Sequence, residues 1–262
     1  MSPSSMRNRT ALVTGSTGGI GLGIATELAQ NGVSLMLHGL EAQGKETARE
    51  LAERCQVSVH HSNADLSSQA GCEELASEAQ SRLGHVDILV NNAGIQFVSP
   101  IDDFPSSKWH QILSVNLSAP FFLSRSLWPA MKTRGFGRII NISSVHGLRA
   151  SELKSAYVAA KHGLVGLTKA LALEGAPLGI TVNALCPGYV MTPLVREQIP
   201  AQAKARHLTE AEVLSDVMLR KQPIKQFIPI PAISRMVLFL VSNEASTVTG
   251  TAIPLDGGWC AQ

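Results

Sequence analysis

The sequence predicts an α/β fold, a single-domain doubly wound parallel sheet of about seven strands with helices on both faces. Short apolar runs rich in β-branched residues alternate with longer helix-forming stretches, which is typical of a parallel sheet covered on both faces. The 262 residues contain no internal repeat and no low-complexity linker, so we expect one domain over residues 1–262.

The elements follow one another in a regular order along the chain. We predict strands at residues 9–14, 33–38, 57–60, 86–90, 137–142, 181–185 and 251–255. We predict helices at residues 22–30, 42–54, 68–83, 106–133, 155–174 and 231–241. Pro120 and Pro129 must kink or break the fourth of these helices, because proline lacks the backbone N–H. Residues 191–229 interrupt the alternation with a polar, helical insert flanked by proline.

Composition and charge exclude several classes of protein. The net charge is +2 without a basic cluster, so we expect no nucleic-acid partner. No apolar run approaches the roughly 18 residues that span a bilayer. The polar N-terminus also lacks the apolar core of a signal peptide, so we expect a cytoplasmic protein with no membrane partner. The cysteines show no paired spacing and the histidines do not cluster with them, so no metal site is predicted.

A glycine-rich turn joins the first predicted strand to the first predicted helix. It reads Gly15-Ser-Thr-Gly-Gly-Ile-Gly21, a spacing that differs from the G-x-G-x-x-G fingerprint. Between a strand and a helix, such a turn aims backbone N–H groups and the helix N-terminus at a pyrophosphate. A glycine cluster alone is often only a turn, but this placement favours a Rossmann-like dinucleotide site.

Tyr157 and Lys161 are four residues apart in a predicted helix, so their side chains share one face. A free tyrosine has a pKa of about 10, too high for proton exchange at neutral pH. An ammonium about 4 Å away at an effective dielectric near 20 favours the phenolate by roughly 4 kcal/mol. We therefore predict a tyrosine with a pKa near neutrality that acts as a general acid and base. The alternative is an ordinary pair on the surface of an amphipathic helix.

Three motifs in this order resemble the short-chain dehydrogenase/reductase family over almost the whole chain. They are Thr14-Gly-x-x-x-Gly-Ile-Gly21, Asn91-Asn-Ala-Gly94 and Tyr157-x-x-x-Lys161. Further matches at residues 15–25, 91–96, 138–147 and 154–157 are similar to the branch of that family that acts on D-3-hydroxybutyrate. The resemblance implies hydride transfer between NAD and a small hydroxy acid, with the keto acid acetoacetate as the oxidised partner.

Three other functions stay open at this point. The chain is also compatible with a dehydrogenase of the same family for another small hydroxy acid, a sugar or a polyol. A non-catalytic NAD-sensing module would not need the full set of catalytic residues. A ketoreductase for carrier-bound acyl chains predicts NADP and a basic docking patch, neither of which the linear sequence indicates.

The resemblance also implies a catalytic set. Tyr157 exchanges the proton, and Ser144 hydrogen-bonds the same substrate oxygen. Lys161 lowers the tyrosine pKa and holds the nicotinamide ribose. Asn116 anchors a water on a proton path to solvent.

The cofactor residues implied by the resemblance gather after the predicted strands. The second predicted strand ends at His38-Gly39-Leu40, which include neither an acid for a ribose 2′-hydroxyl nor an arginine for a 2′-phosphate, and Gly18 stands where many NADP-dependent relatives have a basic residue. The absence of a cation favours NAD. The implied cofactor-binding residues are Gly15, Thr17, Gly19, Ile20, Gly21, Asp65, Leu66, Asn91, Gly94, Tyr157, Lys161, Pro187, Gly188, Val190 and Thr192.

A hydroxy-acid pocket needs a cation for the carboxylate, and the resemblance assigns that role to Lys154. Tyr189 stands where the resemblance predicts a tryptophan, which leaves the chain length of the substrate open. The insert at residues 191–229 is expected to act as a substrate lid, with a fixed packing element as the alternative. The resemblance further implies a homotetramer formed through the two long helices. The implied substrate-binding residues are Gln96, Ser144, His146, Lys154, Tyr157, Tyr189 and Gln198.

Overall fold

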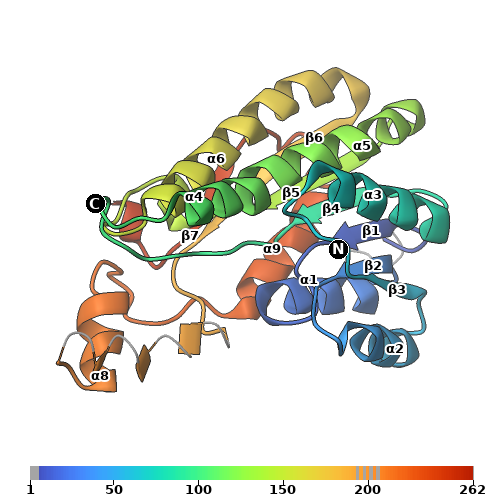
Figure 1. Cartoon of the computed structure of the whole chain (residues 1–262). Coiled ribbons are helices and arrows are strands. Elements are labelled where there is room, and N and C mark those ends of the chain that lie inside the picture. The colour runs from blue at the N-terminus through green and yellow to red at the C-terminus, as the bar shows by residue number, and fades with distance from the viewer. Residues whose placement is uncertain (1–5, 193–194, 197–198, 201–202, 205–206, 262) are drawn as a thin grey trace.

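The computed structural model describes residues 6–192, 195–196, 199–200, 203–204 and 207–261. Seven parallel strands form one sheet in the order β3-β2-β1-β4-β5-β6-β7 (Figure 1). The chain reverses its direction of travel across the sheet between β1 and β4, which is the switch point where ligands of doubly wound sheets bind. The strands are β1 (Thr10–Val13), β2 (Ser34–His38), β3 (Val59–Ser62), β4 (Ile88–Asn91), β5 (Gly137–Ile142), β6 (Ile180–Pro187) and β7 (Ala252–Leu255).

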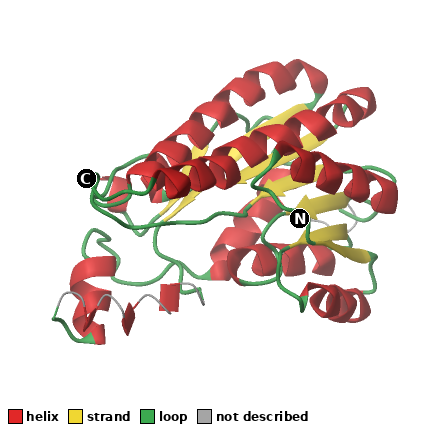
Figure 2. Cartoon of the chain, viewed as in Figure 1, coloured by secondary structure: helices red, strands yellow, loops and turns green. Residues whose placement is uncertain are grey.

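Helices cover both faces of the sheet (Figure 2). One layer contains α1 (Gly19–Gln30), α2 (Gly44–Cys55) and α9 (Ile230–Val241), whose apolar side chains form one core cluster with the sheet. The other layer contains α3 (Gln69–Leu83), α4 (Ser106–Leu113), α5 (Ala119–Arg134) and α6 (Ser155–Gly175). The predicted fold class and the order of its strands and helices are confirmed.

Successive side chains of β1 point to opposite faces of the sheet, which explains why helices must cover both faces. Leu12 packs in the core cluster beneath α3 and α5, whereas Ala11 and Val13 pack in the cluster beneath α1 and α9. All three side chains are fully buried. Strands buried on both faces read as continuous apolar runs, which is the pattern that predicted a parallel sheet.

The predicted helix over residues 106–133 is divided near Pro120. It consists of α4, a π-helical turn at Ser114–Ser118, and α5, which begins at Ala119. Pro120 lies in the first turn of α5, where a missing N–H breaks no helical hydrogen bond. The helix continues through Pro129. The π-helical turn matters for function because it carries Asn116.

The insert at residues 191–229 has a small core of its own. A capping box at Thr209 and Glu212 starts α8 (Glu210–Glu212), and a π-helical turn at Val213–Met218 follows. Apolar side chains of the insert pack together and against Tyr189 at the edge of the sheet. Figure 1 shows α8 set to the side of the sheet, at the opposite end of the molecule from α2. Within the described residues, no helix has the length and apolar character required to cross a bilayer.

Candidate active site

The glycine turn lies at the carboxyl end of β1 and leaves the first turn of α1 open. Gly15 and Gly19 adopt positive φ of 60° and 55°, which glycine tolerates. The N-cap of α1 is Gly18, which has no side chain to accept hydrogen bonds from the N–H groups of the first turn. A Cβ at Gly21 would overlap the carbonyl oxygen of Gly15. This cradle fits the pyrophosphate of a dinucleotide.

Asn92, which the sequence did not single out, locks the glycine turn to the end of β4. Its Nδ2 donates hydrogen bonds of 2.9 Å to the carbonyl oxygens of Thr14 and Gly15. The Thr14 hydroxyl in turn accepts from the backbone N–H groups of Asn92 and Ala93 at 2.9 and 3.0 Å. The second asparagine of the Asn91-Asn92 pair therefore holds the cofactor cradle. Its place in the Asn91-Asn-Ala-Gly94 motif is the sequence feature that could have identified it.

An acidic side chain does follow β2, one residue beyond the segment where the sequence analysis found none. The Glu41 Oε2 accepts a hydrogen bond of 2.5 Å from the Thr17 hydroxyl of the glycine turn. That bond lowers the pKa of the Glu41 carboxyl, so it is an anion at neutral pH. A Cβ on Gly39 would touch both Thr17 and Glu41, so these groups converge on one point of the rim. The expectation that no acid serves this site is therefore wrong, because the chain turns after β2 and brings Glu41 back to the glycine turn.

Asp65 and Leu66, the implied cofactor-binding residues after β3, are oriented in two directions. The Asp65 carboxylate accepts from the Ser67 backbone at 2.9 Å and from the Ser67 hydroxyl at 2.7 Å, and these bonds lower its pKa. Leu66 is buried in the core cluster beneath α3. The Leu66 side chain therefore supports the turn from inside.

Residues after β6 reach back over the glycine turn. Thr192 lies beside Gly19, since a Cβ built on Gly19 would be 3.5 Å from the Thr192 Cγ2. Val190 is buried in the same core cluster as α1 and α9, which fixes the path of this segment. Pro187 ends β6, and Gly188 packs too closely on Gln222 to accept a side chain. The structure thus gathers these predicted residues at the carboxyl edge of the sheet.

Tyr157 and Lys161 occupy the first two turns of α6. The Lys161 Nζ donates to the carbonyl oxygen of Ile142 at 2.8 Å and lies 5.7 Å from the centre of the Tyr157 ring. Burial lowers the pKa of Lys161 to about 8. Burial raises the pKa of Tyr157 to about 12, and a hydrogen bond with Ser144 acts in the opposite direction.

The predicted near-neutral pKa of Tyr157 is therefore wrong for the chain by itself. The sequence argument counted the attraction of a nearby ammonium and left out the cost of burying a phenolate. In the structure the desolvation of Tyr157 is the largest influence on its pKa, and the Lys161 ammonium is directed to a backbone carbonyl oxygen. The consequence is a phenol that holds its proton at neutral pH.

Asn116 clamps the loop that follows β4. Its Oδ1 accepts from the Ile95 N–H and its Nδ2 donates to the Ile95 carbonyl, both at 2.8 Å. A Cβ on Gly94 would lie 3.2 Å from the Asn116 Oδ1 and 3.7 Å from the Lys161 Nζ. Asn116, Gly94 and Lys161 are therefore brought together as predicted, while the water-anchoring role of Asn116 stays a prediction.

Beside Tyr157 and Lys161 lies a pocket wall of aromatic rings, and Lys154 is next to it. The Lys154 Nζ donates to the Tyr189 hydroxyl at 3.4 Å. His146 is buried, its Nδ1 is 3.3 Å from the Ser144 Oγ, and its ring meets that of Tyr157 edge-on at 5.9 Å. The Nε2 of His146 is buried with no hydrogen-bond partner, so it has capacity for a ligand.

Charge and burial together keep His146 neutral. Burial, followed by the positive charges of Lys154 and Lys221, lowers the pKa of His146 to about 3. A neutral imidazole can donate or accept a hydrogen bond but adds no charge to the pocket. Lys154 is therefore the cation that remains beside Tyr189.

Trp259 completes this wall, and the sequence analysis missed it. Its ring stacks on Tyr189 at 6.0 Å with an interplanar angle of 23° and meets His146 edge-on at 5.6 Å. Asp256 holds the turn that carries it, because its carboxylate accepts from the N–H groups of Gly258 and Cys260. The only signal was an aromatic residue next to Gly257-Gly258, which is too weak to assign a role.

The remaining predicted substrate residues are placed in part. Gln96 directly follows Ile95, which Asn116 holds. Gln198 lies outside the described residues. Gln222 was not predicted, but its Oε1 accepts from the Tyr189 N–H at 3.0 Å and positions that ring.

Known proteins are similar to this chain in sequence and in fold. Residues 9–203 match the short chain dehydrogenase family. A D-beta-hydroxybutyrate dehydrogenase of Rhizobium meliloti (strain 1021) is 49% identical, over 97% of this chain and 99% of that protein. A protein of the same name from Cupriavidus necator is 46% identical, over 98% of this chain and 100% of that protein.

A solved structure agrees with the sequence comparison. An actinorhodin polyketide ketoreductase variant, solved with NADPH, is 33% identical and superposes with a TM-score of 0.91. The match covers 100% of this chain and 99% of that one. A dinucleotide cradle, a half-buried tyrosine beside a buried lysine and these relatives agree, and the chain therefore belongs to the short-chain dehydrogenase family.

Proposed function

We propose that the protein is an NAD-dependent dehydrogenase that interconverts D-3-hydroxybutyrate and acetoacetate. The observation that carries this proposal is the Lys154 ammonium beside Tyr189, in an aromatic wall next to Tyr157. A small 3-hydroxy acid has one carboxylate and one secondary alcohol. Lys154 can bind the carboxylate while the alcohol lies next to Tyr157. The names of two relatives at 46% and 49% identity support the same substrate.

The chain's own residues manage the proton of the reaction. When bound, NAD supplies the acceptor for the hydride that leaves the C3 carbon of the alcohol. Oxidation needs Tyr157 as phenolate to take the hydroxyl proton while Ser144 donates a hydrogen bond to the same oxygen, and the pKa of about 12 makes the phenolate rare at neutral pH in the chain by itself. In the reverse direction the Tyr157 phenol returns its proton to the ketone oxygen, and its raised pKa of about 12 suits that step at neutral pH.

The substrate proposal is tested by the rate of NADH formation with D-3-hydroxybutyrate, its L enantiomer and, in parallel, NADP. We expect turnover with the D acid and NAD and little with the other combinations. Turnover only on longer hydroxy acids, sugars or polyols would mean that the enzyme is a dehydrogenase of the same family with another substrate. Tyr189, in place of the expected tryptophan, keeps that alternative open. Absence of turnover on every secondary alcohol would instead favour an NAD-sensing module.

Lys154 provides a sharper test of the carboxylate pocket. Substitution Lys154→Gln is expected to raise the KM for D-3-hydroxybutyrate by about 10- to 100-fold with kcat little changed, because a charged hydrogen bond contributes about 1.5–3 kcal/mol. The matched control is Lys169→Gln, an exposed lysine on the same helix. An unchanged KM in the first variant would argue for a substrate without a carboxylate.

We propose that the protein uses NAD in preference to NADP, because Glu41 lies at the glycine turn. An anionic carboxylate at the rim after β2 can accept a hydrogen bond from a ribose 2′-hydroxyl and repels a 2′-phosphate. Substitution Glu41→Arg is expected to raise kcat/KM for NADP at least about tenfold. The control Glu50→Arg makes the same charge change on an exposed part of α2. Equal kcat/KM for NADP in both variants would show that Glu41 does not determine the choice between NAD and NADP.

We propose that the insert at residues 191–229 closes over the substrate. Its support is the packing of Ile199, Val213 and Met218 in a cluster with Tyr189, which links the insert to the pocket wall. NAD together with D-3-hydroxybutyrate is then expected to slow trypsin cleavage within the insert several-fold. Cleavage at the same rate with and without these ligands would mean that the insert is a fixed packing element.

We further propose a cytoplasmic homotetramer. Trp109 on α4, Phe121 on α5 and Leu173 on α6 are 36%, 41% and 80% exposed, so the outer helical layer carries apolar side chains that a second copy can cover. Light scattering should give a mass near that of four chains. A monomer at micromolar concentration would contradict this assembly.

A further inference from the structure

His38 ends β2, and its ring connects two loops at the carboxyl edge of the sheet. The residue is buried, with 4% of its surface exposed. Its Nδ1 accepts a hydrogen bond of 3.3 Å from the Gly15 N–H in the glycine turn. Its Nε2 lies 2.9 Å from the carbonyl oxygen of Ala64, in the loop between β3 and α3. A carbonyl oxygen only accepts, so the ring is the neutral tautomer that carries its proton on Nε2.

The hydrogen bond to the ring restrains a residue on which the cofactor cradle depends. Gly15 has a positive φ of 60°, and a Cβ built there would come within 2.9 Å of the Ala93 Cα. Asn92 binds the Gly15 carbonyl oxygen from the side of β4. His38 binds the Gly15 N–H from the side of β2. The two side chains together hold Gly15 from both sides, and with it the path of the turn.

The backbone of His38 is bound to the same turn, but through atoms of the main chain. The Ser16 N–H donates to the His38 carbonyl oxygen at 2.8 Å, and the His38 N–H donates to the Ser16 Oγ at 3.0 Å. These bonds do not depend on the side chain at position 38. The contribution that requires a histidine is therefore the acceptor that its ring offers to Gly15.

The surroundings of the ring keep it neutral. Burial lowers the pKa of His38, and the neighbouring His61 of β3 acts in the same direction. The hydrogen bond with Ala64 and the carboxylates of Glu41 and Asp65 act in the opposite direction, with smaller effects. The Nδ1 lone pair is thus available at neutral pH. A protonated ring would instead direct a second donor at the N–H of the glycine turn.

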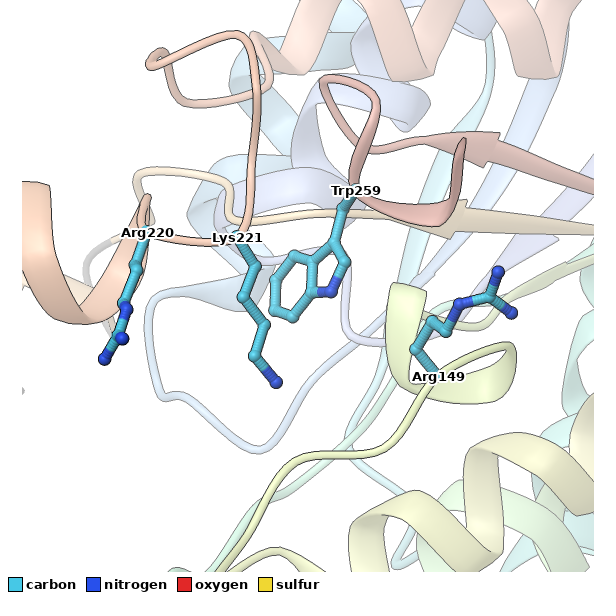
Figure 3. Close-up of a pocket in the computed structure, with 4 residues that line it drawn as sticks. All are labelled: Arg149, Arg220, Lys221 and Trp259. Atoms are coloured by element: carbon cyan, nitrogen blue, oxygen red, sulfur yellow. The ribbon is translucent and has the colours of Figure 1, made fainter. Parts of the chain in front are cut away.

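His38 lies far along the sheet from the substrate pocket. β2 is second from one edge of the sheet, whereas Trp259 of the pocket wall (Figure 3) follows β7 at the other edge. The strands β1, β4, β5 and β6 lie between them. An effect of the His38 ring on cofactor affinity can therefore be separated from an effect on substrate binding.

We propose that His38 is a positioning residue for the dinucleotide, whose ring orients the Gly15 peptide and thereby raises the affinity of the glycine turn for NAD. Without an acceptor, the buried N–H of Gly15 loses its partner and the turn relaxes away from the geometry that binds a pyrophosphate. The inference rests on the proposed use of NAD and is independent of which hydroxy acid is the substrate. A ring that only filled the core would support the stability of the fold and leave cofactor affinity unchanged.

Fluorescence titration of the full chain with NADH tests the role of the ring. His38→Phe keeps a ring but removes both nitrogens, and we expect it to raise the Kd at least about tenfold. The kcat at saturating NAD and the KM for the hydroxy acid should change by no more than a few-fold. His38→Asn places an oxygen near the position of Nδ1, so it should restore the Kd to within a few-fold of the parent value. The matched control is His60→Phe on β3, where the histidine Nε2 contacts the Ser58 hydroxyl and not the glycine turn.

Nitrogen-15 NMR of the parent chain without NAD gives a readout that does not depend on the cofactor or on the folding of a variant. At pH 7 we expect the His38 signals of an imidazole with its proton on Nε2 and a bare Nδ1. The spectrum of His38→Asn assigns these signals by their loss. A proton on Nδ1 would leave the Gly15 N–H without its acceptor and would overturn the proposal.

The binding data also separate this inference from the proposed function. Thermal melting followed by circular dichroism reports whether each variant is folded. The inference alone is overturned if a folded His38→Phe variant binds NADH as tightly as the His60→Phe control, or if His38→Asn loses as much affinity as His38→Phe. Failure of the parent chain to bind NADH would overturn the proposed function together with the inference.

Discussion

Tyr157→Phe is expected to lower kcat by about 10²- to 10⁴-fold, because it removes the group that exchanges the proton with the substrate oxygen. Ser144 keeps its hydroxyl and can still hydrogen-bond that oxygen, but it cannot replace a proton donor that Lys161 supports from the next turn of α6. The ring stays in place, so NAD affinity should change by no more than a few-fold. Steady-state kinetics and NADH fluorescence measure these two quantities separately.

The chain supplies its own control, because it contains only one other tyrosine. Tyr189→Phe removes the same hydroxyl from the pocket wall, where it accepts from Lys154. We expect a rise of a few-fold in KM with kcat nearly unchanged, since this hydroxyl touches no reacting atom. If both variants lost kcat to the same extent, the general acid and base would have to be sought elsewhere.

Gly21→Ala is expected to weaken NAD binding by about 100-fold or more. The new Cβ would overlap the Gly15 carbonyl oxygen and the Asn92 side-chain nitrogen, both parts of the cofactor cradle. The backbone must move to relieve this overlap, and the N–H groups then no longer converge on a pyrophosphate. Fluorescence titration with NADH measures the loss, and circular dichroism shows whether the fold persists.

Gly18→Ala is the matched control for that substitution. Gly18 lies in the same turn, but a Cβ there meets nothing within 4 Å and its φ of −163° is extended backbone that any residue adopts. We expect NAD affinity within a few-fold of the parent protein. Loss of affinity in both variants would mean that the turn needs glycine for flexibility, and the Gly21 contact would not be the cause.

The features that the sequence alone determined are local ones. Apolar runs and helix-forming stretches specify strands and helices through spacing, so the order of elements and the glycine turn after β1 could be predicted. Tyr157 and Lys161 were found because helical geometry places residues four apart on one face. These inferences need no knowledge of which distant segments pack together.

Tertiary structure decided everything that depends on burial or on contacts between distant segments. The raised pKa of Tyr157 comes from burial, which the spacing of two residues does not reveal. Glu41 reaches Thr17 only because the loops after β1 and β2 lie side by side. Trp259, His146 and Tyr189 are far apart in sequence and meet only when β5, β6 and β7 pair. Spacing thus predicted which residues are catalytic candidates, whereas packing determined their protonation and their surroundings.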